Sequence, residues 1–267
     1  MKISNKVILV TGGGNGIGQQ LVLNLLQRGA TVAAVDISED GLNQTLHLAG
    51  SRADRLSLHK TDISNRDAVK ALADEVLNRH GHIDGIINNA GIIHRFMPVS
   101  ELGFDVIDRI INVNLHGVFN ITKTFLPHLK TRPEANITNI SSMGGLFAFP
   151  NQTIYGASKA AVKLFSEGLF AELRNTNIQV TVIFPGAIKT NIAHNCDAHV
   201  ASLERLDKLF SGVSPETAAV KIIQAIEKNR FRAHIGVDAK ILGFLYIFSP
   251  KYTILLISKA MKLVMGS

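Results

Sequence analysis

The feature that most constrains this chain is a glycine-rich turn near its N-terminus, between an apolar run and an amphipathic stretch. Residues 6–11 are mainly β-branched and apolar, residues 11–18 read TGGGNGIG, and leucines recur with helical spacing over residues 16–28. Glycine lets the backbone turn sharply, and a helix N-terminus offers unpaired N–H groups to an anion. The pattern predicts a strand–turn–helix unit that binds a dinucleotide pyrophosphate. The predicted contacts are Gly12, Gly14, Asn15, Gly16, Ile17 and Gly18.

Short apolar runs alternate with helical stretches along most of the chain. Strands are predicted at residues 6–11, 31–36, 56–60, 85–88, 136–141 and 179–184, each followed by a helical segment. Right-handed crossovers place such helices on both faces of a parallel sheet. We therefore expect an α/β fold, a Rossmann-type doubly wound parallel sheet of about seven strands. No linker or repeat divides the sequence, which favours a single domain over residues 1–267.

Two of the predicted helices carry local start signals. Ser64 and Asp67 have capping-box spacing before residues 68–80, and Ser214 precedes Pro215. Serine is a preferred N-cap residue, and proline is favoured at the first helical position. Helices are therefore expected to begin just after Ser64 and Ser214.

Asp36 ends the second predicted strand, 18 residues after Gly18. A carboxylate at this place accepts hydrogen bonds from ribose hydroxyls and repels an adenosine 2′-phosphate. The neighbouring Asn15 and Ile37 supply no cation to receive that phosphate. The sequence therefore predicts NAD as the cofactor, with NADP disfavoured.

Tyr155 and Lys159 lie four positions apart, which places a phenol and an ammonium on one helix face. A free phenol, with a pKa of about 10, is a poor base at neutral pH unless a cation stabilises the phenolate. Lysine can supply that charge, and the phenol can then take a proton from an alcohol or return one to a ketone. The spacing alone is also common in surface helix pairs. Its interpretation as a proton-transfer site depends on the other motifs.

Taken in order, these motifs resemble the short-chain dehydrogenase/reductase family. The family's Thr-Gly-x-x-x-Gly-x-Gly loop matches residues 11–18, and its strand-four motif matches residues 88–91. The resemblance implies a catalytic tetrad, in which Asn114 holds a water in a proton relay and Ser142 hydrogen-bonds the substrate oxygen beside Tyr155 and Lys159. Asn112 and Ser141, the neighbours of two of these residues, are interpreted as structural.

The same resemblance implies further coenzyme contacts. Asp62 matches the family's adenine contact, and the backbone of Ile188 with the Thr190 hydroxyl matches the segment that passes the nicotinamide carboxamide. The full set of further coenzyme residues is Asp36, Ile37, Asp62, Ile63, Asn89, Ala90, Gly91, Tyr155, Lys159, Pro185, Gly186, Ile188 and Thr190.

The segments that set substrate specificity in the family are mainly apolar here. They follow predicted strands four and five and include a substrate loop over about residues 187–213. A charged substrate would require buried cations, which these segments largely lack, so a hydrophobic secondary alcohol or its ketone is favoured. The expected substrate contacts are Ser142, Tyr155, His94, Phe147 and Phe149. A satisfied or exposed histidine is the alternative for His94. No residues show metal-ligand spacing, so no metal is expected.

The net charge of +7 is concentrated at the C-terminus. Residues 228–267 hold seven Lys or Arg and one acid, Asp238, giving +6, and the rest of the chain is nearly neutral. A nucleic-acid groove needs cations spread over a face, usually with aromatics, and the chain has no Trp; nucleic-acid binding is therefore excluded. The basic, apolar extension over about residues 237–267 is interpreted as a cover for the substrate pocket or a subunit interface. Peripheral membrane contact is the alternative.

The N-terminal apolar run is too short for a secretory signal, and no stretch of about 18 apolar residues occurs. The one cysteine, Cys196, fits a reducing compartment. We expect a cytoplasmic protein, membrane-associated only if the extension binds lipid, and not a secreted one.

The leading hypothesis is an NAD(H)-dependent oxidoreductase. The alternative is a nucleotide-binding protein of similar fold with a regulatory or peripheral-membrane role, which the presence of all four tetrad residues disfavours. A nucleotide-sugar epimerase is also disfavoured, because its usual glycine loop and larger C-terminal domain are missing. The family resemblance further implies a homodimer or homotetramer, paired through helices around residues 102–129 and 155–174.

Overall fold

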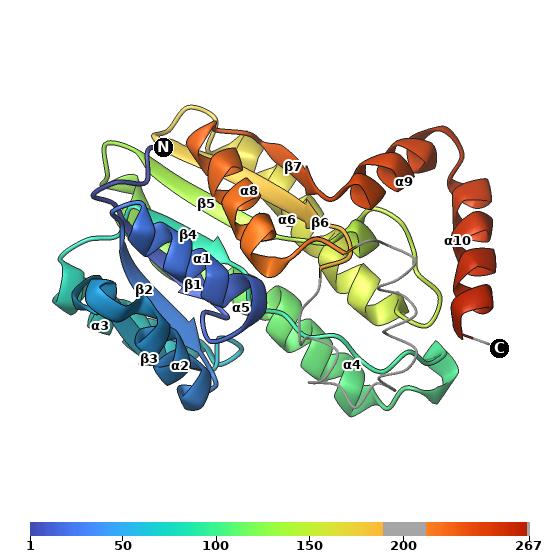
Figure 1. Ribbon diagram of the computed structural model, residues 1–267, viewed down its shortest axis with the longest axis horizontal. Helices are drawn as coiled ribbons and strands as arrows, with labels where there is room; N and C mark the ends of the chain where they lie inside the picture. The colour runs from blue at the N-terminus through green and yellow to red at the C-terminus, as the bar shows by residue number, and fades with distance from the viewer. Residues whose placement is uncertain (189–211, 266–267) are drawn as a thin grey trace.

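The computed structural model describes residues 1–188 and 212–265, and these form one seven-stranded parallel sheet with the strand order β3-β2-β1-β4-β5-β6-β7 (Figure 1). The reversal of strand order lies between β1 and β4, where the first strand pairs with β2 on one side and β4 on the other. This confirms the predicted Rossmann-type fold. The strands are β1 (Val7–Thr11), β2 (Thr31–Asp36), β3 (Leu56–Lys60), β4 (Gly85–Asn88), β5 (Ala135–Ile140), β6 (Ile178–Pro185) and β7 (Arg232–Ile235).

Helices cover both faces of the sheet because successive strand side chains point to opposite sides. In β1, Ile8 and Val10 join the core beneath one helix layer, and Val7 and Leu9 join the core beneath the other. The first layer contains α1 (Gly16–Gln27), α2 (Glu39–Ala49) and α8 (Pro215–Glu227). The second contains α3 (Arg66–His80), α5 (Gly117–Lys130) and α6 (Thr153–Glu172), with α4 (Phe104–Ile111) leading into it.

The predicted strands agree closely with the structure. Strands β2, β3 and β4 have the predicted bounds, and β1, β5 and β6 differ by one residue at one or both ends. The short strand β7 had no counterpart among the predicted strands. The helix expected after Ser64 is instead capped by Asn65, whose side chain accepts hydrogen bonds from the N–H groups of Asp67 and Ala68. Ser214 caps α8 as predicted, with Pro215 at the first helical position.

The C-terminal extension forms two helices, α9 (Val237–Phe248) and α10 (Pro250–Met265), at the end of the molecule opposite α2 and α3 (Figure 1). Its inner face is buried against the loops that follow β4 and β5. Phe147 from the second loop packs with Ile257 and Met261 of α10, and Leu242 and Tyr246 of α9 adjoin this cluster. Within the described residues, no helix has both the length and the apolar character that crossing a bilayer requires.

Candidate active site

The turn between β1 and α1 has a shape that only glycine permits at two of its positions. Gly12 has a φ of +68°, in the left-handed region, and a Cβ there would lie 2.8 Å from the Asn89 side-chain nitrogen. A Cβ on Gly18 would lie 1.9 Å from the Gly12 carbonyl oxygen. Gly18 therefore lets α1 begin directly against the turn. The N-terminal N–H groups of this helix lie at the carboxyl end of β1.

Side chains from other elements fasten this glycine turn. Asp36 accepts the Gly14 N–H at 2.9 Å, and Thr45 of α2 donates its hydroxyl to the Gly13 carbonyl at 2.9 Å. Asn89 donates its side-chain N–H to the Thr11 carbonyl, also at 2.9 Å. Asp36 and Asn89 are among the residues predicted from the sequence, whereas Thr45 is not. Thr45 lies 32 residues after Gly13, in the middle of α2, and no local sequence pattern marks it as a partner of the turn.

A cleft of about 1150 Å³ runs from this turn along the carboxyl ends of the strands to α6. The predicted coenzyme residues line it, with two exceptions. Gly18 is buried beneath the turn, and Thr190 lies outside the described residues. The predicted residues in the cleft wall are Gly12, Gly14, Asn15, Gly16, Ile17, Asp36, Ile37, Asp62, Ile63, Asn89, Ala90, Gly91, Tyr155, Lys159, Pro185, Gly186 and Ile188.

Several cleft residues were not anticipated from the sequence. Gly41 and Gln44 of α2 line the cleft beside the glycine turn, and Asp105, Asp108 and Arg109 of α4 also line it. A Cβ on Gly41 would be 3.0 Å from the Gly14 carbonyl oxygen, so the close approach of α2 to the turn requires glycine on both sides. No periodic pattern in α2 or α4 marks these positions as part of a site.

Ser142, Tyr155 and Lys159 meet in the cleft wall beyond β5. Ser142 follows this strand and begins a short 3-10 turn, where its hydroxyl accepts the Gly144 N–H at 3.0 Å. Tyr155 and Lys159 occupy the first two turns of α6, one turn apart. The Lys159 ammonium donates to the Ile140 carbonyl at 3.0 Å, so the last residue of β5 holds it at the floor of the cleft.

Burial controls the ionisation of both α6 groups. Burial raises the pKa of the Tyr155 phenol, and the Ser142 hydrogen bond only partly opposes this. Burial lowers the pKa of Lys159 to about 8. The sequence-based expectation was a phenol pKa lowered by the lysine. The structure differs because desolvation outweighs the other influences on the phenol, which favours its neutral, proton-donating form.

Asn114 lies behind the cleft wall rather than in it. It belongs to a π-helical turn, η3 (Asn112–His116), between α4 and α5. Its side chain accepts the Ile92 N–H at 2.8 Å, and donates to the Ile92 carbonyl at 2.9 Å and to the Ser158 hydroxyl at 3.0 Å. The amide is thereby fixed between the loop after β4 and α6. Gly91 adjoins it, and a Cβ there would be 2.9 Å from the Lys159 nitrogen.

The neighbours interpreted as structural differ from their partners in their surroundings. Ser141 is buried and donates its hydroxyl to the Lys159 carbonyl at 2.8 Å, whereas Ser142 is half-buried beside Tyr155. Asn112 is exposed at the cleft edge, whereas Asn114 is fully buried. The structure thus gives each member of the two pairs a distinct environment.

The three predicted substrate residues outside the tetrad do not line the described cleft. His94 is buried, and its Nδ1 bonds the Arg95 carbonyl at 2.7 Å, whereas its Nε2 has no partner among the described residues. Phe147 and Phe149 belong to the apolar cluster beneath α9 and α10. Most of the substrate loop, and with it Cys196, lies outside the described residues.

The cleft suits an elongated dinucleotide. The glycine turn supplies backbone N–H groups without Cβ atoms, and the half-buried Asp36 stands at the end of β2, where it also accepts the Ser38 N–H at 2.9 Å. These features fit a pyrophosphate and an adjacent ribose. In the part of the chain that the structure describes, no three His, Cys, Asp or Glu side chains are grouped to hold a metal ion.

Comparisons with known proteins agree with this geometry. A family model described as short chain dehydrogenase matches residues 6–201. A protein of Mycobacterium tuberculosis (strain H37Rv) that is named as an oxidoreductase, SadH, is 38% identical over 247 residues, covering 90% of this chain and 89% of that relative.

Two solved structures carry the same fold. A short-chain dehydrogenase from Burkholderia cenocepacia in complex with NADP is 26% identical with a TM-score of 0.80, covering 96% of this chain and 99% of the other. A short-chain dehydrogenase/reductase from Burkholderia phymatum in complex with NAD is 24% identical with a TM-score of 0.83, covering 97% of both chains. The cofactor therefore differs between structures of similar fold.

Proposed function

Because the chain belongs to the short-chain dehydrogenase family of oxidoreductases, we propose that it interconverts a hydrophobic secondary alcohol and its ketone, with NAD as the cofactor. The observation that carries this proposal is the continuous cleft between the glycine turn and the Ser142, Tyr155 and Lys159 side chains. A nucleotide bound at the turn can therefore extend to the only place in the cleft where a phenol and an ammonium lie one helical turn apart among the described residues.

The proposed roles follow from position. The N–H groups of the turn and of α1 bind the pyrophosphate, and Asp36 binds the ribose hydroxyls. The bound cofactor supplies the site that gives or takes a hydride. Ser142 hydrogen-bonds the substrate oxygen, and Tyr155 transfers a proton to or from that oxygen. Asn114 holds the loop after β4 in place, and the water-mediated relay implied by the family resemblance stays a prediction.

The charge state of the site favours one direction near neutral pH. A phenol whose pKa is raised by burial stays protonated, and it is ready to donate to a ketone. Alcohol oxidation requires Tyr155 to lose its proton first. The rate of alcohol oxidation should therefore rise with pH until the neighbouring Lys159, with a pKa of about 8, loses its charge.

The substrate class is inferred from the apolar cluster next to Tyr155, which adjoins the described cleft but does not line it. Phe147 and Phe149 lie in an apolar cluster with Met143 and Leu146 of the same loop, and α9 and α10 complete it. Apolar surroundings of this kind beside Tyr155 favour an aliphatic or polycyclic alcohol, because a charged group would have to lose its hydration there.

Replacing Tyr155 with Phe tests the proposal. The ring is kept and the transferable proton is lost, so kcat should fall about 1000-fold. Turnover is followed by NADH absorbance over a panel of hydrophobic secondary alcohols and their ketones. Tyr252→Phe, which changes an exposed tyrosine on α10, is the matched control and should keep wild-type activity. Near wild-type turnover of Tyr155→Phe would refute the mechanism.

Cofactor preference has its own test. Asp36→Arg replaces a repelling carboxylate with a guanidinium able to pair with a 2′-phosphate, and the ratio of NADP to NAD efficiency should rise about 10- to 100-fold. Asp36→Asn separates the loss of charge from the gained cation, since it keeps an acceptor oxygen. If Asp36→Arg leaves the ratio of cofactors unchanged, the carboxylate does not select NAD.

The proposal includes assembly as a homodimer or homotetramer through α4, α5 and α6. Its support is the exposure of large apolar side chains on α4 and α6, namely Phe104, Leu164 and Phe170. Sedimentation velocity of the purified chain reports the number of subunits.

A further inference from the structure

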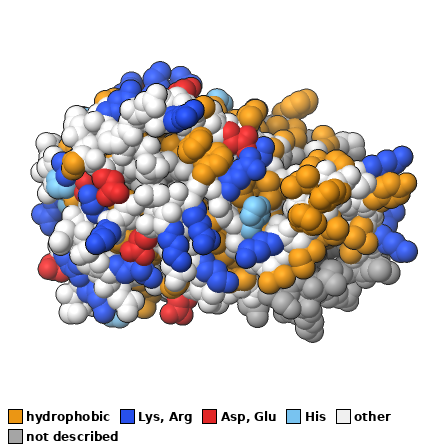
Figure 2. Space-filling model, turned by 90° about the horizontal axis from the view of Figure 1, so that it is seen from above, with side chains coloured by type: hydrophobic (Ala, Val, Ile, Leu, Met, Phe, Trp, Pro, Cys, Tyr) orange, Lys and Arg blue, Asp and Glu red, His pale blue; other side chains and the backbone are white. Residues whose placement is uncertain are grey.

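The C-terminal extension has a second apolar surface that faces away from the other described residues of the chain. Its side chains are between 42% and 76% exposed, whereas the inner face of the same two helices is buried on the Phe147 loop. Figure 2 shows hydrophobic side chains gathered at this end of the molecule. We define the outer apolar face as Ile241, Phe244, Leu245, Ile247 and Phe248 of α9 and Tyr252, Leu255 and Leu256 of α10.

This surface is continuous rather than scattered. Phe244 and Phe248 lie one turn apart on α9, with ring centroids 4.9 Å apart. Ile247 and Tyr252 flank the turn to α10 and are 76% and 73% exposed. Contiguous exposed apolar surface of this kind marks a contact site in soluble proteins, because isolated exposed residues are common and clusters are not.

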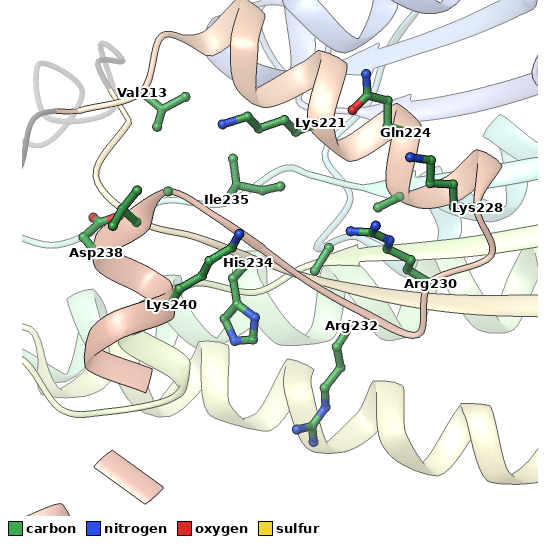
Figure 3. Close-up of a pocket in the computed structure, with 14 residues that line it drawn as sticks. Val213, Lys221, Gln224, Lys228, Arg230, Arg232, His234, Ile235, Asp238 and Lys240 are labelled. Carbon is green, nitrogen blue, oxygen red and sulfur yellow. The ribbon is translucent and has the colours of Figure 1, made fainter. Parts of the chain in front are cut away.

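A basic pocket adjoins the outer apolar face. It has a volume of about 690 Å³ and lies between α8, β7 and the start of α9. Figure 3 shows Lys221, Arg230 and Lys240 around Ile235, with Lys228 next to Arg230, whereas Arg232 points to the other side. Arg232 is paired with Glu167 of α6.

The charge of this pocket is largely unbalanced. The one acid in its wall, Asp238, accepts the Ala187 N–H at 2.7 Å. Among the described residues, no ion pair engages Lys221, Lys228, Arg230 or Lys240. The positive charge of the pocket also acts on His234, whose pKa is lowered by burial and by the charges of Arg232 and Lys240. The pocket is therefore suited to an anion.

The pocket and the outer apolar face share one edge. Lys240 belongs to the pocket, and the next residue, Ile241, belongs to the apolar face. Val237 lines the pocket and is itself 70% exposed. An occupant of this surface must therefore present anionic groups directly beside apolar ones.

We propose that this surface docks on an anionic lipid membrane, with a phosphate headgroup in the basic pocket and the outer apolar face at the level of the upper acyl chains. Interfacial helices bind in this way, through a buried apolar face and cations that meet acidic lipids. A second copy of the chain is a poorer occupant. A twofold contact places each surface against itself, and residues 228–267 carry a net charge of +6. A soluble phosphate fills the pocket but leaves the apolar face uncovered.

Vesicle flotation of the full chain tests the charged part of the proposal. The protein should float with vesicles of phosphatidylcholine containing about 30 mol% phosphatidylserine and much less with phosphatidylcholine alone, and added salt should weaken binding. Lys221→Gln/Lys240→Gln should lower the partition coefficient about 30-fold, at roughly fivefold for each cation near the surface. Lys70→Gln/Arg79→Gln removes two exposed cations of α3 at the far end of the sheet and should leave binding unchanged. An equal loss of vesicle binding in both variants would refute a specific role of the basic pocket.

The apolar part needs a separate variant. Phe244→Gln/Ile247→Gln should abolish flotation at high salt, where the contribution of charge is screened. Leu48→Gln, at an exposed leucine of α2, is the control and should float like the wild type. Thermal melting checks that each variant folds. Failure of the wild type to float refutes the proposal. So does a fall in subunit number for Phe244→Gln/Ile247→Gln, because a second copy would then cover this face.

Discussion

Two halves of the candidate site are built in different ways: the coenzyme half, which is the cleft, and the substrate half, which is the apolar cluster beyond Tyr155. Around the glycine turn, backbone groups and short side chains fix the geometry, as where Asp36 accepts the Gly14 N–H at 2.9 Å. The substrate half consists of apolar side chains brought together from distant parts of the chain. There Phe147 contacts Phe149 of its own loop and Tyr246 of α9, with ring centroids 5.4 and 6.2 Å apart.

The difference shows what each half can tolerate. A steric contact that requires glycine admits no substitution, whereas an apolar cluster accepts other side chains of similar volume. The coenzyme half is therefore rigidly specified. The substrate half can be altered without disturbing the proton transfer proposed for Tyr155.

A pair of glycine variants gives the largest expected contrast between the halves. Gly18→Ala forces a Cβ to within 1.9 Å of the Gly12 carbonyl oxygen, so unfolding should become easier by about 3 kcal/mol or more. Gly243→Ala, in the interior of α9, meets nothing closer than 3.5 Å and should stabilise by about 0.5–1 kcal/mol. Urea denaturation measures both, and NAD titration should show weakened binding only for Gly18→Ala. Similar effects at the two sites would remove the distinction.

The same distinction explains what could be predicted from the sequence. The glycine turn and β2, β3 and β4 depend on residues that lie close together in the chain, and periodicity or spacing reveals them. By contrast, Asn114 takes its partners from Ile92 and Ser158, which are 22 and 44 residues away. The packing of Phe147 against Ile257 of α10 joins residues that are still farther apart in the sequence. No local pattern encodes such contacts.

Other differences have equally specific causes. Ser64 and Asn65 are both good N-cap residues, so composition does not choose between them, and the backbone places Asn65 at the cap. Strand β7 has only four residues and an exposed Arg232, which weakens its apolar pattern. The direction of the Tyr155 pKa shift depends on burial, which sequence spacing does not report.

Lys159 lies at the floor of the cleft, one helical turn after Tyr155, where the coenzyme half meets the substrate half. Its folded-state pKa of about 8 lies below the ordinary lysine value of 10.5, so between these pH values the unfolded chain binds more protons than the folded one. Stability therefore gains about 3 kcal/mol from this group as pH rises through that window, and the gain is absent below pH 8. Lys159→Met removes this pH-dependent gain in stability.

Denaturation of the wild type and Lys159→Met at a series of pH values measures this term. The wild type should become more stable relative to the variant as the pH rises from about 8 to about 10.5. Lys123→Met, at an exposed position of α5, reports the effect of pH on the rest of the protein. A constant difference between wild type and Lys159→Met across this range would mean that the ammonium is not desolvated.

The smallest expected effect tests whether the two halves are connected through Asp238. This carboxylate lies in the first turn of α9 and accepts the Ala187 N–H at 2.7 Å, two residues after the end of β6. It thereby links the C-terminal extension to the cleft wall at Gly186 and Ile188.

Asp238→Ala leaves the Ala187 N–H without its acceptor, which costs about 1–2 kcal/mol locally. Because trypsin cuts the transiently open form, cleavage within α9 and α10 should become about 5- to 30-fold faster. Asp74→Ala, at an exposed position of α3, should not change the cleavage rate. If Asp238→Ala and the control are cut equally fast, apolar packing alone holds the extension, and the two halves are energetically independent.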